Sequence, residues 1–131
     1  MRGGCVRLLI VDDSPLVRKM YGLVFPKREH ALTAVENGRV ALAAIAESQQ
    51  PYDMVLLDLC MPDMNGVEFI RAVRRNPGLT RIPIVLTTAE PEDSDMMRQA
   101  KALGVAAVVR KPWKPQELRD VVQAILHKPV G

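Results

Sequence analysis

The chain alternates short apolar runs with segments whose apolar residues recur every three or four positions. Continuous apolar runs are typical of strands buried on both faces, whereas the three-to-four spacing is typical of helices with one buried face. Strict alternation of the two predicts an α/β fold, in which helices cover both faces of a doubly wound, five-stranded parallel sheet. The predicted strands are residues 7–11, 31–35, 53–57, 83–88 and 106–110, and the predicted helices are residues 14–25, 38–48, 66–76, 91–103 and 115–126.

The predicted helices also carry signals at their ends. Ser14 and Pro15 are residue types that favour the start of a helix, and Pro26 marks the end of the same helix. Gly104 can adopt the left-handed conformation that ends a helix. Helical spacing predicts the following core-facing side chains: Leu16, Met20, Leu23 and Val24; Val40, Ala41, Ala44 and Ile45; Val67, Ile70 and Val73; Leu118, Val121, Val122 and Ile125.

The composition is that of a globular protein. The 131 residues are 48% hydrophobic and 25% charged, which predicts a single domain over residues 1–131 with a core of about residues 7–126. The net charge is only +3, and no dense basic run stands out, so we expect no direct binding of nucleic acid. The arginines at 71, 74, 75 and 81 are expected on an exposed helix face and the loop after it.

The two cysteines, Cys5 and Cys60, do not form the pattern of a disulfide framework. The sequence also contains no signal peptide and no apolar run of roughly 18 residues. We therefore expect a cytoplasmic chain that does not insert into a membrane and whose thiols are reduced.

Charged and hydroxyl side chains occur where the predicted strands end. The carboxyl ends of parallel strands meet at one edge of a sheet, which is where doubly wound folds bind ligands. These side chains are therefore expected to lie close together. They are Asp12 and Asp13 after the first strand, Asp58 after the third, Thr87 and Thr88 at the end of the fourth, and Lys111 after the fifth.

Each of these residues has an ordinary role when taken alone, but the combination predicts a cation. A lone aspartate can stabilise a helix start, a threonine suits a strand, and a lysine suits the surface. Two carboxylates at about 4 Å, however, repel by about 4 kcal/mol at an effective dielectric constant of 20. Oxygen ligands without a His or Cys cluster suit Mg²⁺ or Ca²⁺, and open coordination positions favour Mg²⁺. The Cys60 thiol is a poor ligand for such an ion and is expected to pack.

A magnesium site of this kind predicts phosphoryl chemistry. Lys111 would supply a fixed positive charge for a phosphoryl group, and the Thr88 hydroxyl would donate a hydrogen bond to one of its oxygens. Asp58 would be the nucleophile that forms an aspartyl phosphate.

Four stretches of the sequence resemble the receiver domain of bacterial two-component response regulators: "LLIVDDS", "VLLDLCMPDMNG", "PIVLTTAE" and "VVRKPW". The resemblance runs from about residue 7 to residue 126, and the most similar kind is the stand-alone receiver of the chemotaxis CheY type. CheY is itself a known example of the flavodoxin-like strand order 2-1-3-4-5, so the resemblance implies this order.

The resemblance implies a role for each residue of the site. Asp58 matches the phosphoacceptor, and Lys111 matches the phosphate-binding lysine. Asp13 matches a direct Mg²⁺ ligand, and Asp12 matches a residue that acts on the ion largely through water. The backbone carbonyl of Cys60 would be a further ligand. Thr88 matches the switch hydroxyl, because Ala89 follows it as the family's small residue. The implied partners are a sensor histidine kinase or phosphotransfer protein and a downstream protein target.

Three further positions bear on how such a receiver would signal. The family often carries an aromatic residue three positions before Lys111, where this chain has Val108, so the usual aromatic readout is absent. The peptide bond between Lys111 and Pro112 is expected to be cis, as it usually is in the family. Trp113 would either cover the start of the last helix or be displaced when Lys111 captures a phosphoryl group.

Two other functions remain as alternatives. A phosphorylation-independent binding module would retain the fold, and the Val108 departure is compatible with it. A Mg²⁺-dependent phosphohydrolase of the haloacid-dehalogenase kind also uses an aspartyl phosphate. It needs an aspartate two residues after the nucleophile, however, where this chain has Cys60.

Overall fold

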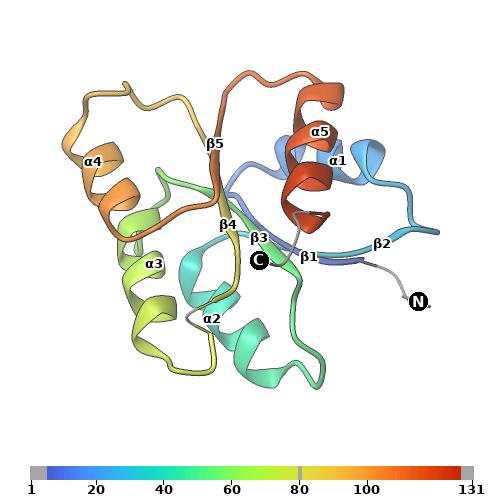
Figure 1. Cartoon of the computed structure of the whole chain (residues 1–131), viewed down its shortest axis with the longest axis horizontal. Coiled ribbons are helices and arrows are strands. Elements are labelled where there is room, and N and C mark those ends of the chain that lie inside the picture. The colour runs from blue at the N-terminus through green and yellow to red at the C-terminus, as the bar shows by residue number, and fades with distance from the viewer. Residues whose placement is uncertain (1–5, 80, 128–131) are drawn as a thin grey trace.

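The computed structural model describes residues 6–79 and 81–127, in which five strands alternate with five helices (Figure 1). This arrangement confirms the predicted α/β fold. The elements are β1 (Val6–Val11), α1 (Pro15–Val24), β2 (His30–Val35), α2 (Gly38–Glu47), β3 (Met54–Asp58), α3 (Gly66–Arg75), β4 (Ile84–Thr88), α4 (Asp95–Ala102), β5 (Ala107–Arg110) and α5 (Pro115–Leu126).

The five strands form one parallel sheet in the order β2-β1-β3-β4-β5, which confirms the flavodoxin-like topology. In the register of β1 and β3, Val11 pairs with Leu57, so the residues that follow β1 lie beside the end of β3. Asp58 pairs with Thr87 on β4. The register therefore brings the ends of β1, β3 and β4 together at one edge of the sheet.

Two hydrophobic clusters hold the helices onto the sheet. Helices α2, α3 and α4 pack on one face around side chains such as Phe69 and Ile70, and α1 and α5 pack on the other around Tyr21 and Leu118. Alternate residues of each strand enter opposite clusters, as Leu8 and Leu9 do in β1. Because both faces are covered, the strands can be apolar along their whole length.

Of the four α1 side chains predicted to face the core, only Val24 does so. Leu16, Met20 and Leu23 are 69%, 37% and 86% exposed, whereas Tyr21 and Val24 are buried. Apolar residues occupy more than one side of this helix, so their spacing is compatible with two rotations about its axis. The observed rotation buries the large ring of Tyr21, which offers more apolar area than Met20 does.

Two smaller predictions also differ from the structure. Val40 on α2 was expected to face the core but is 41% exposed. Helix α4 begins at Asp95 instead of residue 91, because the Ser94 side chain caps it by accepting a hydrogen bond from the backbone N–H of Met97.

Arg74 was predicted to be solvated like the neighbouring arginines. Instead, it connects the segment before β4 to the turn after α4. Its guanidinium donates hydrogen bonds to the backbone carbonyls of Ile82, at 3.1 Å, and Gly104, at 2.8 Å. Arg71, Arg75 and Arg81 are exposed, as expected. No helix within the described ranges has the length and apolar character needed to cross a membrane.

The start of α3 fixes the loop that follows Asp58. Asn65 and Glu68 form a capping box in which each side chain accepts a hydrogen bond from the other's backbone N–H. The N–H of Gly66 donates to the Leu59 carbonyl at 2.8 Å, and a Cβ on Gly66 would lie 2.8 Å from the Cα of Leu59. Only glycine allows this close approach of two backbone segments.

We expect Gly66→Ala to lower the free energy of unfolding by about 1–3 kcal/mol, because the added methyl group must displace the backbone at Leu59. Gly22→Ala in α1 is the matched control, since no atom lies within 4 Å of its added methyl group. It should instead raise the free energy of unfolding by about 0.5–1 kcal/mol through helix propensity. Chemical denaturation measures both, and equal effects of the two substitutions would contradict the close contact.

Candidate functional site

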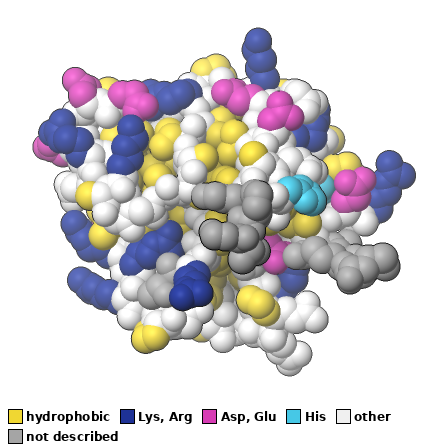
Figure 2. Space-filling model, in the orientation of Figure 1, with side chains coloured by type: hydrophobic (Ala, Val, Ile, Leu, Met, Phe, Trp, Pro, Cys, Tyr) yellow, Lys and Arg dark blue, Asp and Glu magenta, His cyan; other side chains and the backbone are white. Residues whose placement is uncertain are grey.

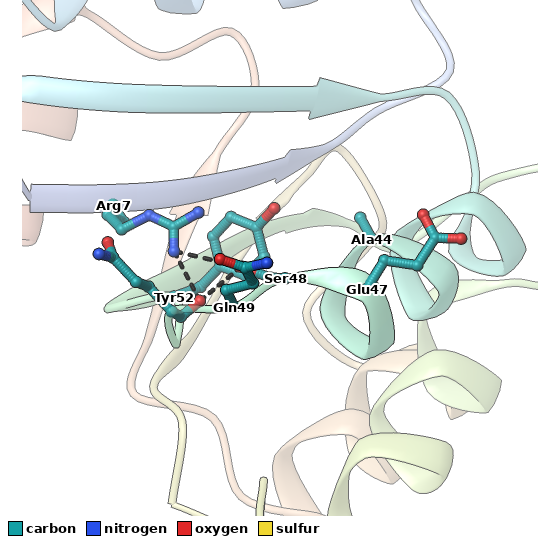
Figure 3. Close-up of a pocket in the computed structure, with 7 residues that line it drawn as sticks. Arg7, Ala44, Glu47, Ser48, Gln49 and Tyr52 are labelled. Atoms are coloured by element: carbon teal, nitrogen blue, oxygen red, sulfur yellow. Dashed lines mark hydrogen bonds between the residues drawn. The ribbon is translucent and has the colours of Figure 1, made fainter.

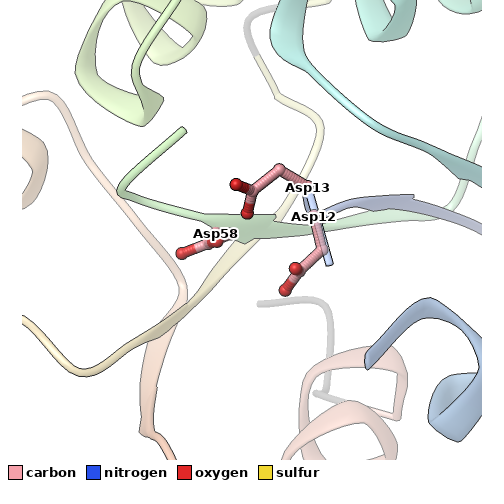
Figure 4. Close-up of side chains that lie close together, drawn as sticks. All are labelled: Asp12, Asp13 and Asp58. Carbon is pink, nitrogen blue, oxygen red and sulfur yellow. The ribbon is translucent and has the colours of Figure 1, made fainter. Parts of the chain in front are cut away.

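Three carboxylates lie together at the carboxyl edge of the sheet (Figure 4). Asp12 and Asp13 follow β1, and Asp58 is the last residue of the neighbouring strand β3. Each offers an oxygen that lies within 4.8 Å of the others'. Asp12 and Asp58 are buried, with 1% and 6% of their surface exposed, whereas Asp13 is exposed. The structure therefore brings together the three aspartates that the sequence predicted.

Lys111 enters the same cluster from the loop after β5. Its Nζ donates to Oδ2 of Asp12 at 2.9 Å and lies 3.4 Å from Oδ2 of Asp58. Burial by itself would lower the pKa of Lys111, but the hydrogen bond with Asp12 and the charges of Asp58 and Asp12 outweigh it and raise the pKa. The lysine is therefore a fixed positive charge next to the acids.

Local hydrogen bonds hold Asp12 in place. Its Oδ1 accepts from the backbone N–H of Ser14 at 3.0 Å, and its backbone carbonyl accepts from Arg18 at 2.6 Å. Ser14 also caps α1, because its side chain accepts a hydrogen bond from the N–H of Val17. The same short turn thus starts the helix and orients the acid.

Asp58 is poorly compensated by its protein surroundings. Burial raises the pKa of its carboxyl group to about 6, against the lowering effect of Lys111, and the nearby charge of Asp12 raises it further. The N–H of Cys60 donates to Oδ1 of Asp58 at 3.3 Å, which offsets only part of this cost. A cation at this edge of the sheet would favour the ionised form of Asp58.

The two threonines at the end of β4 have different surroundings. Thr88 lines a hollow of about 320 Å³ together with Asp58 and Lys111, and its Oγ1 accepts a hydrogen bond from the N–H of Glu90 at 2.9 Å. Thr87 does not line this hollow, and its Oγ1 accepts a hydrogen bond from the hydroxyl of Tyr21 on α1. Of the two threonines, Thr88 is therefore the one that lies beside Asp58 and Lys111, and its role as the switch hydroxyl stays a prediction.

The Cys60 thiol does not pack into the core, contrary to expectation. It is exposed, and its Sγ lies 3.2 Å from Oε1 of Glu90 across the hollow. Burial and the hydrogen bond with Glu90 raise the pKa of the thiol to about 11, so it stays protonated and donates. Sequence reasoning missed Glu90. Its only signal was its position two residues after Thr88, in the turn that leaves the strand.

The segment after Lys111 packs on the face of the sheet that α1 and α5 cover. The Lys111–Pro112 peptide bond is cis, as predicted. Trp113 is 8% exposed and packs against Tyr21, with their ring centroids 5.2 Å apart. The tryptophan therefore covers apolar surface just before α5, which confirms the packing half of the prediction for this residue.

A hollow of about 530 Å³ lies at the opposite end of the sheet, near the start of β1 (Figure 3). Arg7, one of the charged residues that line this hollow, already has hydrogen-bond partners in the protein. The guanidinium donates to the Ser48 hydroxyl and the Gln50 carbonyl and lies 4.7 Å from the ring centroid of Tyr52. These contacts describe a structural anchor for the loop before β3, so we place the functional site at the aspartate cluster.

The donor set at the aspartate cluster fits a hard divalent cation. Three carboxylates offer only oxygen atoms, and one of the acids, Asp13, is accessible to solvent. Such ligands suit Mg²⁺ or Ca²⁺. The excess negative charge, which Lys111 offsets only in part, is a second reason for a cation here.

Residues 8–123 match the sequence profile of the response regulator receiver domain. The chain belongs to this family. Receiver domains are phosphoacceptors of two-component signalling, and they bind Mg²⁺ at an acidic cluster of the kind formed by Asp12, Asp13 and Asp58.

Relatives of known name are similar over most of this receiver. The DNA-binding response regulator MtrA of Mycolicibacterium smegmatis is 35% identical over 93% of this chain and 51% of its own length. The transcriptional regulatory protein ResD of Bacillus subtilis is 31% identical over 93% of this chain and 48% of its own length. The chain thus spans about half the length of these relatives. The structure of chemotaxis protein CheY4 of Vibrio cholerae matches with a TM-score of 0.83 at 29% identity, over 93% of this chain and 99% of that one.

We expect Asp58→Asn to stabilise the protein in magnesium-free buffer at pH 7.5 by about 1 kcal/mol or more, or roughly 3–5 °C in Tm. A raised pKa in the folded state means that the ionised carboxylate opposes folding. This cost is absent below the ordinary pKa of an aspartate and complete above about pH 6. The gain should therefore shrink when thermal unfolding is measured at pH 4.5.

Adding Mg²⁺ should raise the Tm of the wild-type protein more than it raises the Tm of the Asp58→Asn variant. Asp93→Asn, which removes an exposed acid outside the cluster, is the control and should change Tm little. A lower Tm for Asp58→Asn at pH 7.5 would show that Lys111 compensates Asp58 fully.

Proposed function

We propose that this receiver acts by itself as a response regulator of one domain, residues 1–131, in the cytoplasm. It accepts a phosphoryl group on Asp58 from a sensor histidine kinase or a phosphotransfer protein and then changes its binding to a partner protein. The observation that carries the proposal is the meeting of Asp58, Thr88 and Lys111 in one hollow beside the other two aspartates.

In the proposed reaction, a carboxylate oxygen of Asp58 attacks the phosphorus of a phosphohistidine. The new bond joins that oxygen to phosphorus, and the P–N bond to the donor imidazole breaks. Lys111 stays beside the transferred group as its charge partner. The Thr88 oxygen accepts from the N–H of Glu90, so the hydroxyl proton can be donated to the transferred group. Asp13, Asp58 and the Cys60 carbonyl, with Asp12 nearby, would hold Mg²⁺, and the chemistry that the ion would supply is neutralisation of phosphoryl charge.

In this proposal the protein does not turn over an external substrate, because the phosphoryl group remains on the side chain of Asp58. It would assist its own phosphorylation and dephosphorylation only. Its target is proposed to be a protein and not nucleic acid, although MtrA is named as a DNA-binding regulator. The modest net charge of +3 supports this choice, as does the likeness to CheY4, a chemotaxis protein, which covers 93% of this chain and 99% of CheY4.

The surface between α4 and α5 is the proposed output face. Hydrophobic side chains are visible there on both sides of β5, bordered by charged ones (Figure 2). Val108 on β5 packs against the hydrophobic cluster of α3 and α4 and has no ring that could move inward. This absence is compatible with the second candidate, a binding module that works without phosphorylation. Phosphorylation of Asp58 would distinguish the two.

Incubation with acetyl phosphate and Mg²⁺ should add one phosphoryl group to the wild-type protein, detected by intact mass. Asp58→Asn and wild type with EDTA should show none. Asp93→Asn serves as the control and should react like the wild type. The same adduct on Asp58→Asn would show that another residue is the acceptor.

Beryllofluoride, which mimics the phosphoryl group, should bind Lys111→Ala about ten- to a hundredfold more weakly in Mg²⁺, because a charged hydrogen bond is lost. Circular dichroism should show an intact fold.

Thr88→Ala should still accept a phosphoryl group from acetyl phosphate but lose most of the resulting change in amide hydrogen exchange at α4. A defect in Thr87→Ala with none in Thr88→Ala would contradict the assignment of the switch hydroxyl.

A further inference from the structure

A polar contact lies inside the otherwise apolar packing of α1 against the sheet. The hydroxyl of Tyr21 donates a hydrogen bond of 3.2 Å to Oγ1 of Thr87, and the two residues are 1% and 0% exposed. Burial raises the pKa of Tyr21, and the charges of Asp12 and Asp58 raise it further, so the phenol stays protonated and can act as the donor. Apolar side chains would fill this position without the need to satisfy two polar groups.

The contact reaches the strand that carries the switch hydroxyl. Thr87 is the pairing partner of Asp58 in the sheet and immediately precedes Thr88. Its side chain is held from the α1 side by Tyr21, whereas the Thr88 hydroxyl lies in the phosphorylation hollow. A hydrogen bond at Thr87 therefore restrains the end of β4 at the point where Thr88 must be placed.

The ring of Tyr21 reaches the loop that carries the lysine. It packs on Trp113, two residues after Lys111, and the backbone N–H of Lys111 donates to the Thr88 carbonyl at 2.9 Å. Lys111 and Trp113 also line one apolar hollow of about 310 Å³, which leaves room for the indole to shift. One side chain of α1 thus contacts the neighbours of both residues proposed to hold the phosphoryl group.

We propose that Tyr21 is a positioning residue for phosphoryl capture: through Thr87 and Trp113 it sets the spacing of Thr88 and Lys111 around Asp58. The proposal rests on the proposed function and adds to it a residue that touches none of the reacting atoms. It also gives α1 and Trp113 a part in reporting the state of the site, on the face of the sheet opposite α4.

Tyr21→Phe removes the hydroxyl and keeps the ring. In Mg²⁺ we expect about a three- to tenfold weaker affinity for beryllofluoride, measured by calorimetry, because one buried neutral hydrogen bond is lost. Phosphorylation by acetyl phosphate should slow by a similar factor. The change in Trp113 fluorescence on saturation with beryllofluoride should fall to less than half of the wild-type change.

Tyr52→Phe is the matched control. The Tyr52 hydroxyl donates to Oγ1 of Thr33 at 3.3 Å, and this pair lies toward the opposite end of the sheet from Asp58. A merely structural role for Tyr21 predicts that both variants lose thermal stability and both keep wild-type affinity for beryllofluoride.

Variants of Thr87 test the same bond from its other end. Thr87→Val should reproduce the loss of affinity, and Thr87→Ser, which keeps the hydroxyl, should restore affinity to within about twofold of the wild type. The double variant Tyr21→Phe/Thr87→Val should be no weaker than either single variant, because both remove one shared interaction. This set also decides the proposal if Tyr21→Phe does not fold.

Two results would overturn the positioning role. If wild type binds beryllofluoride and Tyr21→Phe and Thr87→Val bind it equally well, Tyr21 only packs. If wild type binds no beryllofluoride and gains no phosphoryl group from acetyl phosphate, the proposed function fails, and the role of Tyr21 fails with it.

Discussion

Repulsion among carboxylates at one edge of the sheet is the constraint on which this structure depends. Asp58 ends β3, and Asp12 and Asp13 follow the neighbouring strand β1, so the register of the strands holds the three acids with oxygens within 4.8 Å of one another. Lys111 offsets part of the charge, and the raised pKa of Asp58 shows that the remainder is not compensated. The edge is therefore suited to bind a cation together with a phosphoryl group. The uncompensated charge lowers the free energy of unfolding of the unliganded protein.

The two faces of the sheet serve this edge differently. On the side of α2, α3 and α4 a mainly apolar cluster packs against β3 through Val55 and Leu57. On the side of α1 and α5 a hydrogen-bonded tyrosine lies close behind the site and packs on Trp113. A rearrangement at Asp58 thus meets the buried hydrogen bond of Tyr21 with Thr87 on one face, whereas the cluster on the other face consists mainly of apolar side chains.

Most residues of the site could be predicted because each of them ends or directly follows a predicted strand. Asp58 and Thr88 stand out because a charge or hydroxyl ends a continuous apolar strand, and the meeting of parallel strand ends then places them together. The start of α1 was predictable for a similar reason, since Ser14 and Pro15 act on the nearest backbone groups. The side of α1 that faces the core could not be predicted, because the apolar residues of this helix are compatible with two rotations about its axis. The residues that surround Tyr21 in the folded protein favour one of the two rotations.

The alternation of strands and helices, the ends of most elements, and the residues that meet at the carboxyl edge could all be predicted from the order of the amino acids. These depend on backbone preferences and on hydrophobic periodicity, which act over a few residues. Three contacts between distant segments become visible only in the folded chain. Tyr21 donates a hydrogen bond to Thr87, 66 residues away, the Cys60 thiol donates to Glu90, and Lys111 donates to Asp12 across 99 residues. Such pairs depend on which surfaces the completed sheet brings together, and the free energy that selects them is summed over many contacts that no local pattern records.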